Sequence, residues 1–429
     1  MKPLRQSGPM RQVTAVVIGA GQCGLAASHY LAARSIDHVV LERGEVANSW
    51  RCERWDSLRL LTPNWQSRLP GWHYRGSDPD GFMTMTEVID FISGYARDTQ
   101  APVQTYTRVR AVYPALNGYR VVTDRGAWQC RALVVASGAF NIPVVPSIAG
   151  ALPHKIHSVT PHHYRKPGSL PEGGVLVIGA AATGLQIADE LRRAGRRVML
   201  AVGEHVRMPR TYRGQDIMYW MHASGLLDEH YAEVDDIRRL RKLPSPQLIG
   251  TPERVTLDLN AVTGRGVELV GRVAGLSANR LQFSGSLANI AKLADLKLGR
   301  LLTAFDAWIE ANGTAGEVGP IERPAPTCVS RSPRLELDLG SGEINTIIWC
   351  TGFRPDYSWL RLPVLDHKGL IRHEGGVADA PGLYVMGLPF LRRRKSSFLF
   401  GVEDDARELC DHLAAYLGVG RSTGLRATA

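Results

Sequence analysis

Two glycine turns are the parts of this chain whose residue types and spacing could do chemistry. The first reads Gly19-Ala20-Gly21-Gln22-Cys23-Gly24 and the second reads Gly179-Ala180-Ala181-Ala182-Thr183-Gly184. Each follows a short apolar run and opens a stretch with helical spacing. In such a turn the first glycine permits a strand-to-helix reversal, the second lets backbone approach a pyrophosphate, and the third lets the helix pack on the sheet. One intact copy and one altered copy predict two bound nucleotides.

A carboxylate stands at the distance from the first turn that ribose binding requires. Glu42 comes 18 residues after Gly24 (42 minus 24) and directly follows an apolar run that ends at Leu41. Its carboxylate can accept hydrogen bonds from the ribose hydroxyls of an adenine dinucleotide that has no 2′-phosphate, such as FAD or NAD. The first turn is therefore predicted to bind a dinucleotide of this kind.

The second turn differs at positions that decide how a nucleotide binds. Val202 takes the place of the carboxylate, and Arg207 and Arg210 follow it with guanidinium forks suited to phosphate oxygens. These residues favour NADPH, while Glu204 keeps NADH as an open alternative. Ala181 replaces the middle glycine and adds a methyl group where backbone would meet the pyrophosphate. A weakened or inactive second site therefore also stays open.

Each turn must be positioned by a strand before it and a helix after it. The sequence predicts strand, helix and strand in this order twice, over 15–18, 24–33 and 39–41 and again over 175–178, 184–194 and 197–202. A helix over 84–98, with Thr86 available as its cap, and a meander of short strands over 103–135 follow the first unit.

Two similar strand ends indicate how the units are joined. Leu133–Gly138 resembles Thr346–Phe353, as expected if the chain leaves one domain at the first segment and returns near the second. We therefore predict an α/β fold with two Rossmann-like dinucleotide-binding domains, the domain of the second turn being inserted into the domain of the first. The predicted ranges are 1–154 and 353–429 for the first domain, which the resemblance named below makes the FAD-binding domain, and 155–352 for the second, which it makes the NADPH-binding domain.

Composition restricts the class of protein further. With 429 residues and 44% hydrophobic content, the chain can bury a large core over about two or three domains. The net charge of +10 is spread along the sequence, so we expect anionic cofactors and no nucleic acid. Six cysteines form neither a Cys-x-x-Cys pair nor a zinc-ligand spacing, which predicts a cytoplasmic protein without a metal. No apolar run approaches about 18 residues, so we expect no membrane span.

Several motifs occur in an order that is typical of one group of flavoproteins. Beside the two glycine turns they are Glu42-Arg43, Ser49-Trp50-Arg51, Trp55–Leu60, Leu69–Gly71, Thr351–Phe353 and Gly382–Gly387. In this order the chain resembles the flavin-containing monooxygenase superfamily in its small bacterial form, over nearly its whole length. The resemblance implies FAD at the first turn and NADPH at the second. It further implies an enzyme that uses dioxygen to oxygenate a nitrogen, a sulfur or a ketone carbon of a small or medium organic substrate through a C4a-peroxyflavin.

The same resemblance implies roles for individual residues. Glu42 would hold the FAD ribose, Arg43 would flank the adenine, and the backbone of Val109 would contact it. Ser49, Trp50 and Arg51 would line the path of the pyrophosphate and flavin, and Asn64 would approach the flavin edge as the one residue at the reacting centre. The other predicted cofactor contacts are Gly19, Gly21, Gln22, Gly24, Gly138, Gly179, Gly184, Arg207, Arg210 and Gly387.

Other interpretations stay open at this stage. The family's Phe-x-Gly-x-x-x-His segment is incomplete, because Ala151 and Pro153 take the phenylalanine and glycine positions and His157 remains at its end. A flavin reductase or dehydrogenase that passes electrons to an acceptor other than oxygen is one alternative, and a nucleotide-binding regulator without turnover is another. The basic run Arg392–Lys395 either supports negative charge on the reduced flavin through the helix that follows it or forms a solvated loop. The sequence is compatible with a homodimer.

Overall fold

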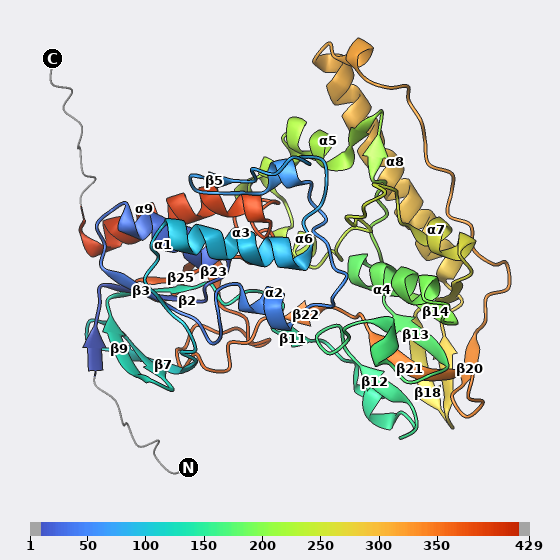
Figure 1. The fold of residues 1–429 in the computed structure, drawn as a ribbon, viewed down its shortest axis with the longest axis horizontal. Coiled ribbons are helices and arrows are strands. Elements are labelled where there is room, and N and C mark those ends of the chain that lie inside the picture. Colours follow the sequence, from blue (N-terminus) through green and yellow to red (C-terminus); the bar gives the residue numbers. More distant parts are fainter. Residues whose placement is uncertain (1–9, 420–429) are drawn as a thin grey trace.

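The computed structural model describes residues 10–419, which fold around two sheets with helices packed against them (Figure 1). Within these residues the first sheet has the order β23-β24-β25-β10-β2-β3-β6 and the second has the order β12-β21-β13-β14-β17. The strands from β25 to β6 are parallel, as are all strands of the second sheet. Two parallel sheets with strand–helix–strand units confirm the predicted α/β class.

The first sheet is made of short apolar runs, and its central strands are buried on both faces, as parallel strands require. Its strands are β2 (Ala15–Ile18), β3 (His38–Leu41), β6 (Val103–Gln104), β10 (Ala132–Val135), β23 (His373–Glu374), β24 (Val377–Ala378) and β25 (Leu383–Val385). The helices α1 (Gln22–Ala32), α3 (Met85–Asp98) and α9 (Val402–Leu417) lie on one face (Figure 1). The opposite face carries the sheet of β1 (Met10–Gln12), β7 (Val109–Ala115), β8 (Gly118–Thr123) and β9 (Gly126–Cys130).

Helix α3 begins at a cap that differs from the predicted one. The Thr84 hydroxyl accepts the backbone N–H of Glu87 at 3.3 Å, and the Glu87 carboxylate accepts the backbone N–H of Thr84 at 2.7 Å. Two donors that the first turn would leave unpaired are thus satisfied. Thr86, the residue expected as cap, lies inside the helix.

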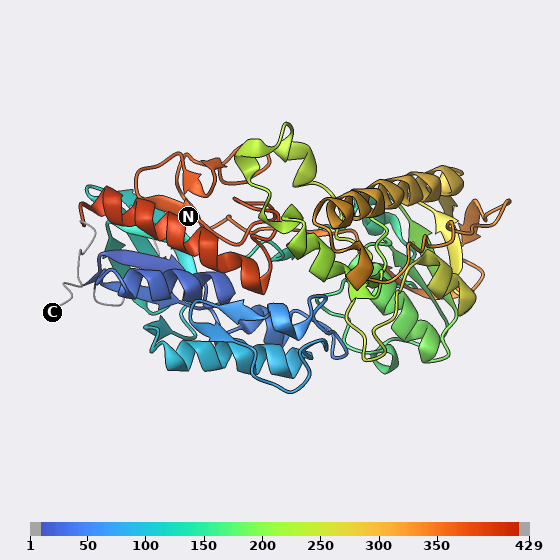
Figure 2. The same cartoon turned by 90° about the horizontal axis from the view of Figure 1, so that it is seen from above.

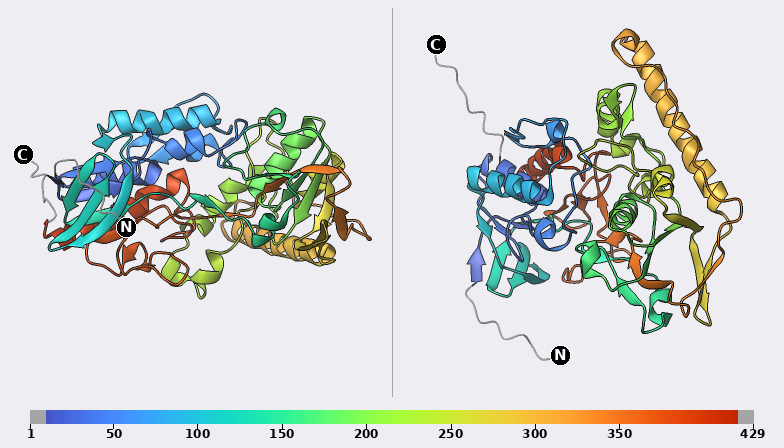
Figure 3. Two further views of the ribbon diagram at one scale, coloured as in Figure 1. Left: turned by 90° about the horizontal axis from the view of Figure 1, so that it is seen from below. Right: turned by 45° about the vertical axis from the view of Figure 1, so that its right-hand side comes forward.

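The second sheet repeats the plan of the first. Its strands are β12 (His157–Val159), β13 (Gly174–Ile178), β14 (Val198–Val202), β17 (Glu268–Gly271) and β21 (Ile344–Trp349). Helix α4 (Ala182–Arg193) connects β13 to β14, and α7 (Leu259–Gly264) packs beside it. A smaller antiparallel sheet of β18 (Val273–Ser277), β19 (Arg280–Phe283) and β20 (Glu336–Asp338) adjoins this unit, and the long helix α8 (Leu287–Ala311) runs along its outer side (Figure 3).

The chain passes between the two units through neighbouring segments. β11 (Ile142–Pro143) follows β10 on the way out, β22 (Phe353–Arg354) follows β21 on the way back, and the two pair antiparallel. The backbone N–H of Val144 also donates to the Gly352 carbonyl at 2.9 Å. The predicted boundaries after 154 and 352 fall near these crossings, while their extreme ranges 1–9 and 420–429 lie outside the described residues. The division into separate domains stays a prediction.

A helical layer spans the space between the units. It contains α5 (Ile217–Ala223) and α6 (Ile237–Leu240), and α5 lies between α9 and α8 when the molecule is seen from above (Figure 2). Residues of α5 and α8 share one apolar cluster with Phe400, which lies two residues before the start of α9. The remaining short elements used below are α2 (Asn48–Cys52), the 3-10 turns η1 (Asn64–Gln66) and η7 (Leu399–Gly401), and the strands β4 (Arg68–Leu69), β5 (Trp72–His73), β15 (Thr211–Tyr212) and β16 (Gln215–Asp216). None of the helices within residues 10–419 is long and apolar enough to cross a membrane.

Candidate functional site

The first glycine turn is closed where the chain packs and open where a ligand would lie. A Cβ atom on Gly19 would stand 2.5 Å from the Ala136 carbonyl oxygen, and one on Gly24 would stand 1.8 Å from the Gly19 carbonyl oxygen. A Cβ atom on Gly21 would meet nothing within 4 Å. Gly21 is also the N-cap of α1, which has neither a side-chain cap nor an acidic residue in its first turn. The free N–H groups and dipole of α1 therefore face open space, and this cradle fits a pyrophosphate.

The second turn has the same backbone despite its alanine. Gly179 and Gly184 are as crowded as their counterparts, with Cβ positions 2.2 Å from the Cys350 oxygen and 1.8 Å from the Gly179 oxygen. Ala181 caps α4 at φ −78° and ψ −176°, close to the φ −86° and ψ −175° of Gly21. The alanine is therefore unstrained, and its methyl group occupies the place that is open in the first turn. Helix α4 also begins without a side-chain cap or an early acid, so the cradle fits a second dinucleotide.

Glu42 is held at the end of β3 beside the first turn. Its carboxylate accepts the backbone N–H of Ala20 at 2.8 Å and that of Gly44 at 3.1 Å, and the residue is only 6% exposed. Each oxygen can accept a further hydrogen bond, because a carboxylate offers about four acceptor sites. The arrangement suits a ribose hydroxyl, and the role predicted for Glu42 stays a prediction.

Helix α2 is attached to the same turn. Its N-cap, Ala47, donates its backbone N–H to the Ala20 carbonyl at 3.1 Å, which brings Ser49 and Trp50 to the nucleotide side of the sheet. The Arg51 side chain donates instead to the Val46 carbonyl at 3.0 Å and to Ser93 of α3 at 3.2 Å. Arg51 is thus held against α3, while its place on the pyrophosphate path stays a prediction.

Four other predicted contacts lie around this turn. Arg43 forms an ion pair with Glu53. Val109 opens β7 two residues after Thr107, whose backbone N–H donates to the Glu42 carbonyl at 2.7 Å. Gly387 approaches the start of α1 so closely that a Cβ atom on it would stand 2.7 Å from the Cys23 sulfur. Gly138, at φ +83°, follows β10 at the same edge of the sheet.

Asn64 lies on a segment of buried polar side chains that lack partners. Its amide nitrogen donates to the Asp78 carbonyl at 2.9 Å, but its Oδ1 has no partner among residues 10–419. Both amide atoms of Gln66 and the hydroxyl of Ser67 are equally buried and unpaired within these residues. Buried polar groups are nearly always paired, so this segment is built to receive a polar ligand or water. Sequence reasoning missed Gln66 and Ser67, because no local pattern distinguishes them from ordinary loop residues.

This polar segment adjoins the start of α9. It leads into β4, which packs against η7, and the Arg68 guanidinium lies 5.6 Å from the centre of the Phe400 ring. The Trp65 ring lies 6.1 Å from that of His222 on α5. The segment therefore occupies the junction between the first unit and the helical layer.

The two arginines predicted to bind the NADPH phosphate are buried and form ion pairs inside the protein. Arg207 is 5% exposed and pairs with Asp258 and Asp295, both at 2.7 Å. Arg210 is 1% exposed and pairs with Asp216 at 2.5 Å, and burial lowers the pKa of its guanidinium. A charge inside a protein requires a partner, and the chain supplies internal carboxylates for both. These guanidinium groups are therefore committed to the interior, which corrects the prediction.

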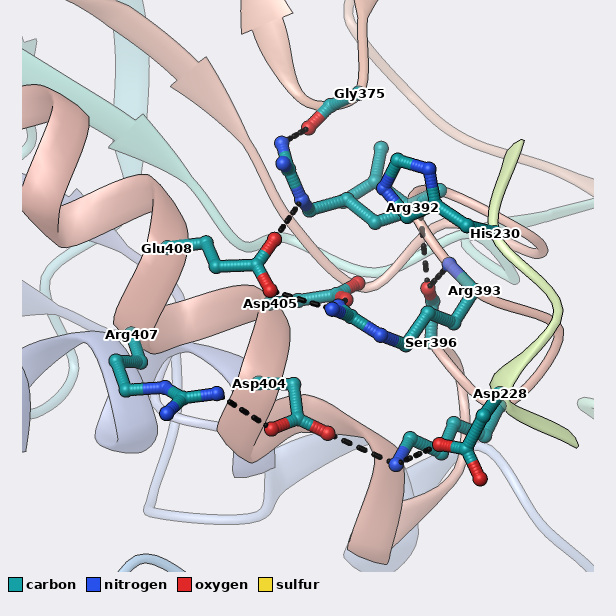
Figure 4. Close-up of polar contacts among 12 residues, drawn as sticks. Asp228, His230, Gly375, Arg392, Arg393, Ser396, Asp404, Asp405, Arg407 and Glu408 are labelled. Atoms are coloured by element: carbon teal, nitrogen blue, oxygen red, sulfur yellow. Dashed lines mark hydrogen bonds and ion pairs between the residues drawn. The ribbon is translucent and has the colours of Figure 1, made fainter. Parts of the chain in front are cut away.

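The basic run Arg392–Lys395 is neither a solvated loop nor a free positive charge. Arg392 and Arg393 both bind Glu408 of α9, and the Lys395 ammonium lies 2.8 Å from Asp404 and 2.5 Å from Asp228 (Figure 4). The run therefore joins α9 to the inserted part of the chain through neutralised pairs, which corrects the interpretation as a solvated loop, while support of the reduced flavin by the start of α9 stays a prediction.

Asp405 stands out within this network. Its Oδ1 lies 3.3 Å from Arg393, its Oδ2 has no hydrogen-bond partner among residues 10–419, and the residue is 1% exposed. Burial raises the pKa of this carboxyl to about 6. The carboxyl therefore takes up its proton in mild acid, around pH 6, rather than near pH 4.

A cavity of about 670 Å³ lies between α8, the chain that follows β14 and the segment over 319–325. Its wall includes Tyr212, whose hydroxyl donates to Asp306 at 2.7 Å, and Arg323, which pairs with the same carboxylate at 2.5 Å. The volume is within the range of pockets that take small organic molecules.

Known proteins share both the sequence pattern and the fold of this chain. Residues 16–224 match the pyridine nucleotide-disulphide oxidoreductase family. An uncharacterized CzcO-like oxidoreductase of Geobacillus kaustophilus is 31% identical over 405 residues, which is 94% of this chain and 98% of the relative. Rice indole-3-pyruvate monooxygenase YUCCA1 is 31% identical over 321 residues, 71% of this chain and 77% of that enzyme.

Solved structures extend the likeness in fold. A flavin-containing monooxygenase from Stenotrophomonas maltophilia superposes with a TM-score of 0.66 at 22% identity, over 95% of this chain and all of that chain (100%). Bacillithiol disulfide reductase from Staphylococcus aureus gives a TM-score of 0.61 at 13% identity, over 95% and 99% of the two chains.

Proposed function

The chain belongs to the flavin-containing monooxygenase superfamily, and from this premise we propose that it is an FAD- and NADPH-dependent monooxygenase of a small or medium organic substrate. Membership makes it an oxidoreductase that uses flavin and pyridine nucleotide. The observation that carries the finer proposal is the pair of helices α1 and α4, each uncapped behind a glycine turn, of which only the first has a carboxylate at ribose distance.

Residues around the first turn are proposed to bind FAD. Bound FAD would supply the hydride acceptor and the reaction of its electrons with dioxygen. The N–H groups at the start of α1 bind its pyrophosphate, and Glu42 binds its ribose. Asn64, Gln66 and Ser67 offer their unpaired polar atoms to the edge of the ring. Because these atoms are already buried, the protein pays little reorganisation on binding and excludes water from the same space.

The cysteines argue against electron transfer through a protein disulfide. Cys23 stands at the start of α1, but burial raises its pKa to about 12, and Asp405 adds to the shift. A thiol of this kind does not become a nucleophilic thiolate at neutral pH. All six cysteines are unpaired, so a disulfide relay of the reductase type has no residues to use.

The test is a spectral titration followed by product analysis. The purified protein should show flavin absorbance, NADPH should bleach it without oxygen, and labelled dioxygen should place one labelled oxygen atom in an organic product. Anaerobic bleaching followed by aerobic return of the colour, with hydrogen peroxide as the only product across nitrogen, sulfur and ketone substrates, would favour the reductase alternative. A protein that neither contains nor binds FAD would refute the proposal.

A further inference from the structure

One arginine that sequence reasoning passed over lies at the nucleotide edge of the second sheet. Arg272 directly follows β17, the strand beside β14. Because Val202 pairs with Gly271, the residues after the two strands emerge together. The Cδ and Cγ atoms of Arg272 lie 3.8 and 3.9 Å from the position that a Cβ atom on Gly203 would take. The side chain of Arg272 therefore lies along the end of β14.

Arg272 is exposed and uncommitted, unlike three arginines that lie close to the second glycine turn and its helix. Its guanidinium forms no ion pair or hydrogen bond with any residue in the described range 10–419. By contrast, Arg193 pairs with Asp189, and Arg196 donates to backbone carbonyls. Arg197 pairs with Glu343. Arg272 is thus available for an anion from outside the protein.

In a dinucleotide-binding unit, the residues at the end of the strand that corresponds to β14 contact the adenosine ribose. A carboxylate at this place binds the 2′-hydroxyl and repels a 2′-phosphate. Here Val202 and Gly203 provide no carboxylate, and the nearby Glu204 is 64% exposed and pairs with Lys297 of α8 at 3.3 Å. Because Lys297 pairs with Glu204, the one carboxylate at the end of β14 is already neutralised, and Arg272 brings a further positive charge to this edge.

We propose that Arg272 binds the 2′-phosphate of the nicotinamide dinucleotide and makes the protein select NADPH over NADH, with Lys297 neutralising the Glu204 carboxylate beside it. A guanidinium fork can donate two parallel hydrogen bonds to a phosphate, which a ribose hydroxyl cannot match. The inference rests on the proposed function, since it specifies the electron donor of that enzyme. It also replaces Arg207 and Arg210, whose charges are used inside the protein.

The test compares ligands that differ only in the 2′-phosphate, on the flavin-loaded protein by calorimetry. Arg272→Gln should weaken binding of 2′,5′-ADP and NADP⁺ about tenfold or more, while 5′-ADP and NAD⁺ bind as to the wild type. Arg272→Lys should keep part of the preference, because the charge remains and the fork is lost. Glu204→Gln should strengthen 2′,5′-ADP binding.

Arg280→Gln is the matched control. Arg280 lies on β19 of the same unit, is similarly exposed, and pairs weakly with Glu336 at 3.4 Å, so its loss should leave all four affinities unchanged. Equal weakening of phosphorylated and unphosphorylated ligands by Arg272→Gln, or no weakening, would overturn the inference while leaving a dinucleotide-dependent enzyme in place. Failure of the wild type to bind either NADP⁺ or NAD⁺ would overturn the proposed function and this inference together.

Discussion

Replacement of Gly21 by alanine separates the folding role of the first turn from its binding role. The backbone of Gly21, at φ −86° and ψ −175°, is one that any residue adopts, and an added Cβ atom would meet nothing within 4 Å. Gly24, three residues on, is different, because its Cβ atom would stand 1.8 Å from the Gly19 carbonyl oxygen. We therefore expect Gly21→Ala to fold and Gly24→Ala to be strongly destabilised.

The expected magnitudes follow from these surroundings. Alanine at position 21 should gain about 0.4–1 kcal/mol by restricting the unfolded chain, offset by a similar loss because alanine is a poor N-cap. The free energy of unfolding of the flavin-free protein should thus change by less than about 1 kcal/mol. The methyl group lies in the path of the pyrophosphate, and overpacking there should cost about 1–3 kcal/mol of binding, or about 5- to 150-fold in the dissociation constant for FAD.

Two measurements check this reasoning. Denaturant unfolding of the flavin-free variants should place Gly21→Ala near the wild type and Gly24→Ala about 3 kcal/mol or more below it. FAD titration should show the loss of affinity in Gly21→Ala, and Ala181→Gly should do the reverse at the second turn by strengthening NADP⁺ binding. The reasoning is refuted if Gly21→Ala binds FAD as the wild type does, or if it unfolds as readily as Gly24→Ala.

Three further substitutions test contacts that hold the site in place. Thr84→Ala should cost about 1 kcal/mol of unfolding free energy because it removes the cap of α3, whereas Thr86→Ala should cost little, and equal effects would contradict the capping geometry. Arg207→Gln should cost about 3–5 kcal/mol by leaving the buried Asp258 without its partner, and a loss below that of the exposed Arg280→Gln would show that this pair is not buried in solution. Asp405 has a folded-state pKa of about 6, above its unfolded value, so its contribution to stability is greatest in acid and is lost as pH rises. The stability of Asp405→Asn relative to the wild type should therefore increase by about 2 kcal/mol between roughly pH 4 and 6, and a constant difference across that range would refute the raised pKa.

Much of the fold and the position of the nucleotide turns could be predicted because they depend on local patterns. An apolar run such as Val16–Ile18 forms a buried strand wherever it lies, and Gly19 and Gly24 permit one particular reversal into a helix. Glu42 could be found by counting along the chain, because the helix and strand that bring it beside Ala20 have a nearly fixed length.

The uses of individual polar residues could not be predicted in this way. Gln66 and Ser67 have no sequence pattern that reports their burial, and Thr86 is as suitable a cap by type as Thr84. The capping residue was decided by where the chain enters α3. Burial of a polar side chain and the choice of a capping residue both depend on the path of the backbone and on the segments that pack against the side chain.

The sequence by itself determined that this protein has two glycine turns of the dinucleotide-binding type, only the first of them followed by a carboxylate at the spacing of a ribose contact, within an α/β fold. Only the tertiary structure decided what its charges do. Arg207 meets Asp258 and Asp295, which lie 51 and 88 residues further along the chain, whereas Arg272 emerges uncommitted beside Gly203. The physical reason is that a charged side chain is free to bind a ligand only if it is exposed and unpaired. Its burial and its partners come from distant parts of the chain, and neither can be read from residue type and spacing.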